Sequence, residues 1–109
     1  MTTIEFSRIG ALTTVRMSGH AEYSPGADIV CAAASVLVCT LIAALQDERD
    51  AGGLKFLVTR HEKGDAFVQF EPAPAAGVRV RAIADTALAG FSLLAGHYPD
   101  NVLLKNFNG

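Results

Sequence analysis

The chain has 109 residues, of which 50% are hydrophobic and 18% are charged. This length suits one domain with a modest core, and the apolar content argues against a disordered chain. A net charge of −2 at pH 7 gives no basic surface of the kind that non-specific nucleic-acid binding needs. We therefore expect a single domain over residues 1–109 that does not bind nucleic acid directly.

The N-terminal segment has the pattern of an antiparallel β-hairpin. Residues 3–6 and 12–18 each have a strand pattern, and a turn at residues 9–11 joins them. A loop over residues 21–27 follows, and a Ser-Pro-Gly sequence within it excludes regular structure.

The most apolar segment of the chain predicts a helix over residues 28–46, with Asp28 as its N-cap. Because this segment is apolar nearly all round, we expect it to be buried on most sides. Its length is at the lower limit for a membrane span. Its alanines, its acidic flanks and the globular patterns on both sides favour a core helix, so we expect no membrane association.

The second half of the chain repeats the strand, strand, helix order. The spacing predicts strands over residues 54–60 and 66–70, followed by a small-residue linker over residues 72–77. A helix over residues 78–95, with Gly96 at its C-terminus, and an edge strand over residues 102–107 complete the chain. The resulting order, ββαββαβ, favours an α+β fold with two helices packed on one mainly antiparallel sheet.

One imidazole and one thiol lie on either side of the loop over residues 21–27. His20 follows the second strand, and Cys31 falls in the first turn of the helix, where N–H groups and partial positive charge favour a thiolate. Those N–H groups could also donate to an oxyanion on a substrate carbonyl. A histidine beside the thiol would act as general base and then as acid. This pattern predicts Cys31 as a nucleophile paired with His20.

Both cysteines and all three histidines also have structural interpretations. A free cysteine is most often a small buried hydrophobe, which is our interpretation of Cys39 and the alternative for Cys31. His20 could simply lie at a strand end. We interpret His61 and His97 as surface or capping residues.

The residues around the pair have two interpretations each. Asp28 caps the helix, orients His20, or does both. Ser35 is a core hydroxyl bonded to the backbone or a contact to the site. Glu22 and Tyr23 are ordinary loop residues or substrate contacts.

The cysteines and histidines show no metal-ligand spacing, so we expect neither a metal nor a cofactor. Cys31 and Cys39 on one helix would be about 12 Å apart, too far for a disulfide. The N-terminus lacks a signal-peptide pattern. We therefore expect a reduced, cytoplasmic protein.

At these residues the sequence resembles the ribosomal-processing cysteine protease family (Prp, YsxB-like). The motifs are Gly19-His20-Ala21 and residues 26–33, followed by Ser35, and agreement extends along essentially the whole chain. The resemblance implies an α/β sandwich that pairs as a homodimer. It also implies a bacterial endopeptidase that removes a short N-terminal extension from a large-subunit ribosomal protein.

The resemblance assigns roles to individual residues. The catalytic pair of the family maps onto His20 and Cys31, and the family's aspartate maps onto Asp28. The loop between the pair, which contains Glu22, Tyr23 and Gly26, would close over the substrate. Here that loop is about one residue shorter than usual and contains Pro25, which would stiffen it.

We therefore expect a cysteine endopeptidase with a ribosomal protein as its substrate. One alternative is a non-catalytic ribosome-associated binding or assembly factor, in which Cys31 is only a core residue. A further alternative is a redox-sensing thiol, which would form a sulfenate without peptide cleavage.

Overall fold

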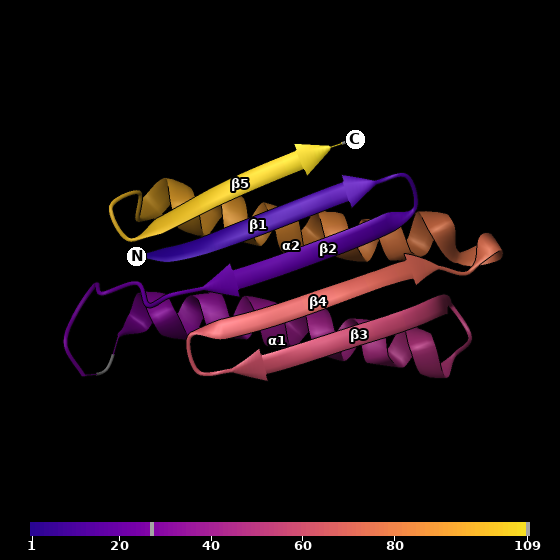
Figure 1. The fold of residues 1–109 in the computed structure, drawn as a ribbon, viewed down its shortest axis with the longest axis horizontal. Helices are drawn as coiled ribbons and strands as arrows, with labels where there is room; N and C mark the ends of the chain where they lie inside the picture. The colour runs from indigo at the N-terminus through magenta and orange to yellow at the C-terminus, as the bar shows by residue number, and fades with distance from the viewer. Residues whose placement is uncertain (27, 109) are drawn as a thin grey trace.

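A computed structural model describes residues 1–26 and 28–108 (Figure 1). Residue 27 of the predicted loop, and residue 109 of the predicted domain, lie outside the described residues. The element order is the predicted ββαββαβ, with a 3-10 turn, η1, before the second helix. The elements are β1 (Thr2–Ile9), β2 (Leu12–Ser18), α1 (Ile29–Asp50), β3 (Leu54–Glu62), β4 (Asp65–Pro72), η1 (Pro74–Ala76), α2 (Gly77–His97) and β5 (Val102–Asn108).

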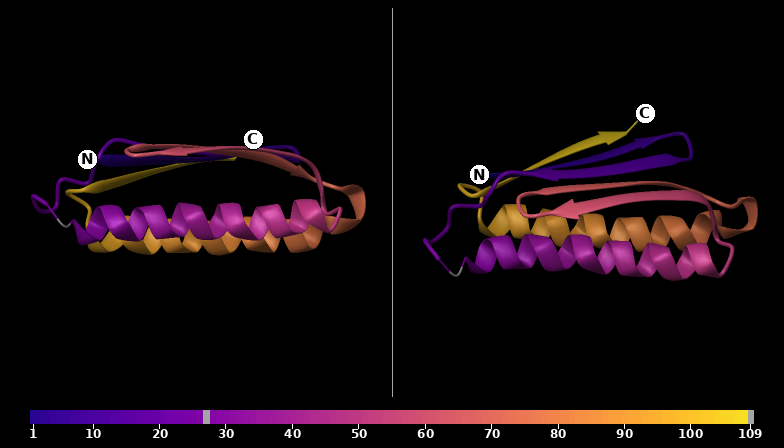
Figure 2. Two further views of the ribbon diagram at one scale, coloured as in Figure 1. Left: turned by 90° about the horizontal axis from the view of Figure 1, so that it is seen from below. Right: turned by 60° about the horizontal axis from the view of Figure 1, so that its bottom comes forward.

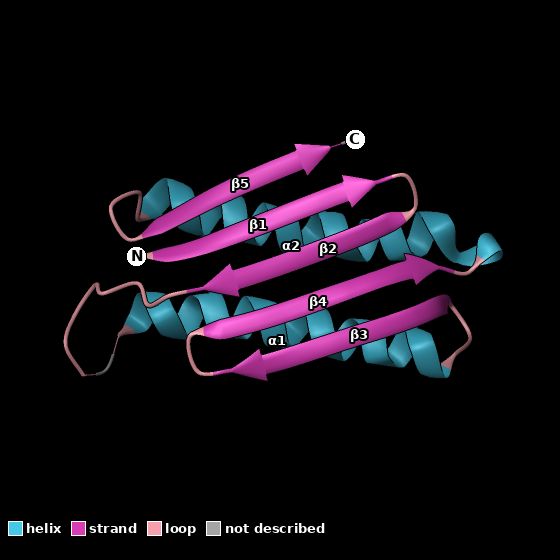
Figure 3. Ribbon diagram, viewed as in Figure 1, coloured by secondary structure: helices cyan, strands magenta, loops and turns pink. Residues whose placement is uncertain are grey.

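The strands form one five-stranded sheet of order β3-β4-β2-β1-β5. Neighbouring strands are antiparallel except β1 and β5, which run parallel, so the sheet is mixed but mainly antiparallel, as predicted. Both helices lie on the same face of the sheet, which gives two layers (Figures 2 and 3). β5 lies at the edge of the sheet, also as predicted.

The core fills the space between the two layers. Alternate residues of each central strand point into it, which is the period-2 pattern of a sheet with one covered face. The helices contribute residues at spacings of three and four. The buried apolar residues include Ile4, Phe6, Val15, Met17, Val68 and Phe70 from the strands, Val30, Ala34, Val38, Leu41 and Leu45 from α1, and Val80, Ala84, Phe91 and Leu94 from α2.

The ends of both helices differ from the prediction. α1 continues to Asp50 instead of residue 46, because its last turn is polar and the apolar periodicity no longer marks it. In that turn Glu48 forms a two-point ion pair with Arg79 of α2, at 2.6 and 2.9 Å. Gly96 lies inside α2, which continues to His97 with Tyr98 as its C-cap.

The predicted burial of α1 on most sides is wrong. One face of the helix is buried, whereas Ile29 and Val36 are 60% and 63% exposed. The reason is the two-layer architecture, in which α1 packs against α2 and β3 and no described residue outside the helix covers its outer face. By length and composition alone α1 could cross a membrane, a test that the core helices of soluble proteins also pass.

Candidate active site

The start of α1 is built around the carboxylate of Asp28. Its backbone is extended, and Oδ1 accepts the N–H groups of Val30 and Cys31 at 2.9 and 3.0 Å. Oδ2 accepts the N–H groups of Tyr23 and Ser24 at 2.8 and 3.4 Å. These bonds, with that from Cys31 the largest cause, hold the pKa of Asp28 below its usual 3.8. The predicted N-cap is therefore confirmed.

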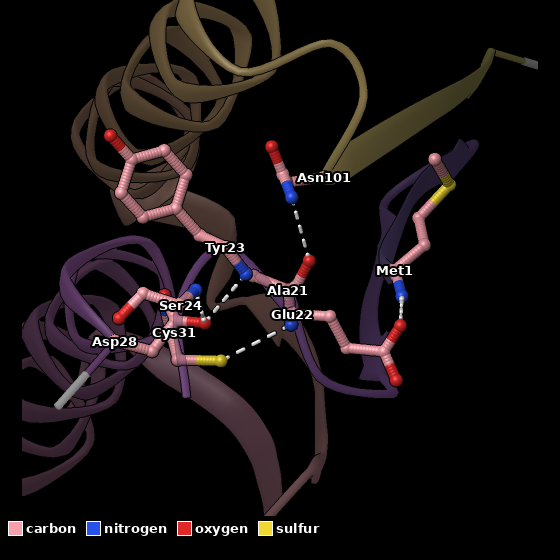
Figure 4. A network of polar contacts seen from close by, with 8 residues as sticks. All are labelled: Met1, Ala21, Glu22, Tyr23, Ser24, Asp28, Cys31 and Asn101. Carbon is pink, nitrogen blue, oxygen red and sulfur yellow. Dashed lines mark hydrogen bonds and ion pairs between the residues drawn. The ribbon is translucent and has the colours of Figure 1, made fainter. Parts of the chain in front are cut away.

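Cys31 receives its hydrogen bond from the loop and not from the helix. Asp28 occupies the N–H groups of Val30 and Cys31, so the expectation that these groups stabilise a thiolate or an oxyanion is wrong. Instead, the N–H of Ala21 donates to Sγ of Cys31 at 3.2 Å (Figure 4). This hydrogen bond joins the backbone of the loop to the sulfur.

His20 is held beside the turn between β3 and β4. Gly19, at a φ of +87°, donates its N–H to the carbonyl of Gly64 at 2.9 Å. The imidazole lies over Gly64, because a Cβ on that glycine would be 2.8 Å from both Cε1 and Nε2 of the ring. Within residues 1–26 and 28–108, His20 and Cys31 share no hydrogen bond.

His20 and Cys31 nevertheless line the same cleft, which has a volume of about 850 Å³. Its walls are the start of α1, the loop after β2 and the turn between β3 and β4. The lining carries three carboxylates, those of Glu22, Asp28 and Glu62, against one lysine, Lys63, beside the imidazoles of His20 and His61. Such a cleft suits a ligand with basic groups.

Three of the other predicted site residues line the cleft. Glu22 does so with a φ of +57°, while its carboxylate lies 3.7 Å from the N-terminal amine of Met1. Gly26 lines the cleft with a φ of +79°. Ser35 lies one turn beyond Cys31, and its hydroxyl makes no hydrogen bond to any described residue, contrary to the backbone-bonded interpretation.

Tyr23 does not line the cleft, although the sequence allowed it as a substrate contact. Its ring packs edge-on against Tyr98, with 5.2 Å between the ring centroids. The interpretation of Tyr23 as a loop residue therefore fits the structure better. Its ring holds the loop against the end of α2.

Sequence reasoning missed Asn101, which lies in the turn between α2 and β5. Its Nδ2 donates to the carbonyl of Ala21 at 3.0 Å, across 80 positions of the chain. No motif marks such a contact, because only the parallel pairing of β5 with β1 brings these segments together.

The other cysteine and histidines have clear surroundings. Cys39 is exposed, with Sγ 3.5 Å from Nδ1 of His61 at the end of β3, so its predicted burial is wrong. His61 is a surface residue, as predicted, but it also lines the cleft. His97 contacts the carbonyl of Leu93 at 2.8 Å, near the end of α2 as predicted.

Among the described residues no cluster of three His, Cys, Asp or Glu could hold a metal ion.

A family model described as cysteine protease Prp matches residues 1–103. The chain belongs to this family. It is accordingly a cysteine peptidase, and the Prp fold agrees with the architecture seen here. No curated protein matches the chain.

Solved structures share the fold over nearly the whole chain. SMU.848 from Streptococcus mutans has a TM-score of 0.73 at 26% identity, covering 100% of this chain and 96% of its own. The essential ribosomal processing protease Prp from S. aureus, with a covalently linked product peptide, has a TM-score of 0.72 at 22% identity. The same protease with a substrate peptide has a TM-score of 0.69 at 20% identity. Each S. aureus comparison covers 97% of this chain and 99% of the other.

Proposed function

We propose that this Prp-family peptidase uses Cys31 as its nucleophile and His20 as its general base and acid. The observation that carries the proposal is that both side chains line one cleft while the amide directly after His20 donates to Sγ of Cys31 at 3.2 Å. That linkage ties the backbone of the histidine to the sulfur. The proposal requires the exposed imidazole to turn away from Gly64 until a ring nitrogen reaches the thiol.

The reaction follows the general course of covalent peptide hydrolysis. His20 accepts the thiol proton, and the thiolate of Cys31 attacks the peptide carbonyl carbon to form a C–S bond and an oxyanion. In this proposal the N–H of Ala21, which is directed at Sγ in the free protein, becomes the donor to that oxyanion. His20 then gives its proton to the departing amine as the C–N bond breaks. Water hydrolyses the thioester and restores the thiol.

Asp28, Ser35, Glu22 and Gly26 support this chemistry in different ways. Asp28 acts as the cap that joins the helix start to the loop, since its hydrogen bonds all go to backbone N–H groups. Ser35 contributes a hydroxyl to the cleft wall below the nucleophile. Glu22 and Gly26 contact the substrate from the loop.

The substrate is a large-subunit ribosomal protein, from which a short N-terminal extension is removed. Three carboxylates against one lysine in the cleft lining support a basic substrate, and a protein of the same fold is described as a ribosomal processing protease. We further propose that residues 1–109 act as one cytoplasmic domain that forms a homodimer. It needs no metal, cofactor, nucleic acid or membrane for the reaction.

The test is cleavage of the organism's own ribosomal protein carrying its N-terminal extension, read by intact mass. We expect the wild type to make a single cut. Cys31→Ala should lose activity by more than about a thousandfold, because nucleophile removal eliminates the covalent route. Cys39→Ala is the matched control and should cut normally.

Cutting by Cys31→Ala would contradict the assigned nucleophile. If the folded wild type binds the ribosomal protein without cutting it, the protein is instead a non-catalytic ribosome-associated factor.

A further inference from the structure

We propose that Asn101 is a positioning residue of this active site, holding the backbone that joins His20 to the sulfur of Cys31. The inference rests on the proposed function. It concerns a residue that is distant in sequence and that lies outside the cleft lining.

Asn101 is itself rigidly anchored. Its N–H donates to the carbonyl of Tyr98 at 3.0 Å, which closes the turn after α2. Its own carbonyl accepts the N–H of Thr2 at 2.9 Å, at the point where β1 and β5 begin to pair. Two backbone hydrogen bonds to different elements therefore fix the position of the Asn101 Cα, from which the side chain extends.

The side chain of Asn101 holds the backbone of Ala21 beside the start of α1. Nδ2 of Asn101 donates to the carbonyl of Ala21 at 3.0 Å, while the N–H of Ala21 donates to Sγ of Cys31 at 3.2 Å (Figure 4). Ala21 is 1% exposed. Its two peptide groups are thus held from opposite sides, by the β5 end of the sheet and by the nucleophile.

Loss of the Asn101 amide would leave the Ala21 carbonyl without this partner in a partly buried position. An unpaired carbonyl there is costly, so the segment would rotate toward water. That rotation would move the N–H of Ala21 away from Sγ of Cys31. It would also shift the backbone of His20, which precedes Ala21. The rest of the loop would keep its attachment, because Tyr23 and Ser24 bond to Asp28 independently.

The experiment uses Asn101→Ala and Asn101→Asp in a Cys39→Ser background, so that Cys31 is the single thiol. Aspartate keeps nearly the same shape but cannot donate the hydrogen bond and adds a negative charge at pH 7. Alanine removes the donor without that charge, so an effect shared by both variants reports the loss of the donor. Asn106→Ala is the matched control, since Asn106 is an exposed asparagine of β5. Two readouts are taken: the alkylation rate of Cys31 at pH 7, and kcat and KM for cleavage.

We expect both Asn101 variants to lower kcat by about 10- to 100-fold with KM little changed, because misplacement by about 1 Å has effects of that size. Cys31 alkylation at pH 7 should slow several-fold, because the thiolate loses a hydrogen-bond donor. Asn106→Ala should match the parent in both readouts.

Unchanged kcat and unchanged alkylation in either folded Asn101 variant would overturn the role of Asn101. If Asn101→Ala fails to fold, Asn101→Asp carries the test. The amide of Ala21 provides a third readout, because its hydrogen exchange should accelerate in the variants and stay slow in the control. If the wild type does not cleave the ribosomal protein, alkylation still tests Asn101, so the two proposals fail separately.

Discussion

At the scale of single residues, the carboxylate of Asp28 decides which donors remain for Cys31. One carboxylate oxygen takes the N–H groups of the helix start and the other takes those of the loop. The sulfur therefore depends on the N–H of Ala21, which the loop supplies. The helix cap can be predicted from the residue type and its position before the apolar segment, whereas the contacts of Asp28 with the loop cannot.

The cap gives the protein a defined acid dependence. Backbone N–H donors, that of Cys31 first, hold the pKa of Asp28 in the folded protein below 3.8, so ionisation favours folding. This contribution is complete above pH 3.8 and is lost as the pH falls through the lower folded value. We expect the melting temperature of the wild type to exceed that of Asp28→Asn at pH 7, and the difference to shrink toward zero at pH 2. A difference of equal size at both pH values would contradict this account.

The glycine beneath His20 gives a second prediction at this scale. Gly64 and Gly52 both have positive φ, +76° and +82°, so alanine strains either backbone by about 1–2 kcal/mol. Only at Gly64 does the added Cβ meet the imidazole of His20. We expect Gly64→Ala to lower cleavage about 10- to 100-fold and Gly52→Ala to leave it unchanged. Equal activities of the two folded variants would show that the position of His20 over Gly64 is unimportant.

At the scale of the elements, periodicity predicted both long helices and the central strands because each buries one face. β3 was predicted as well, although only Leu54 and Leu57 of that strand are half-buried and its other residues are exposed. It could not predict that the outer face of α1 stays uncovered, since burial depends on the number of layers. It also missed the last turn of α1, where polar residues form an ion pair with α2 instead of packing in the core.

The contact between the two helices can be tested at Gly90. A Cβ there would lie 2.6 Å from Cδ2 of Leu37, whereas a Cβ at Gly96 of the same helix would meet nothing within 4 Å. Alanine gains up to roughly 1 kcal/mol over glycine in a helix, and overpacking costs about 1–3 kcal/mol. We expect Gly96→Ala to raise the free energy of unfolding by more than Gly90→Ala does, measured by urea denaturation, because only at Gly90 must the end of the Leu37 side chain shift. Equal gains of stability in the two variants would mean that the helices do not approach as closely as described.

At the scale of the whole molecule, the site depends on a connection that no local pattern reveals. The parallel pairing of β5 with β1 brings the turn after α2 to the loop that carries His20. The proposal of His20 and Cys31 as site residues comes from the sequence, because they flank one short loop in a characteristic motif. Asn101 and Tyr98 could not, because they reach that loop only after the entire sheet has formed.

The central claim is that His20 activates Cys31 in the assembled fold, and thiol reactivity tests it without knowledge of the substrate. The measurement is the alkylation rate of Cys31 at pH 7 and pH 9 in Cys39→Ser protein, with and without His20→Ala. His97→Ala is the matched control, because His97 lies outside the cleft lining. We predict that His20→Ala slows alkylation at pH 7 by about tenfold or more and has little effect at pH 9, since a base is needed only where the thiol is protonated. Equal rates at pH 7 for the His20 variant, the His97 variant and the parent would contradict the pairing of His20 with Cys31.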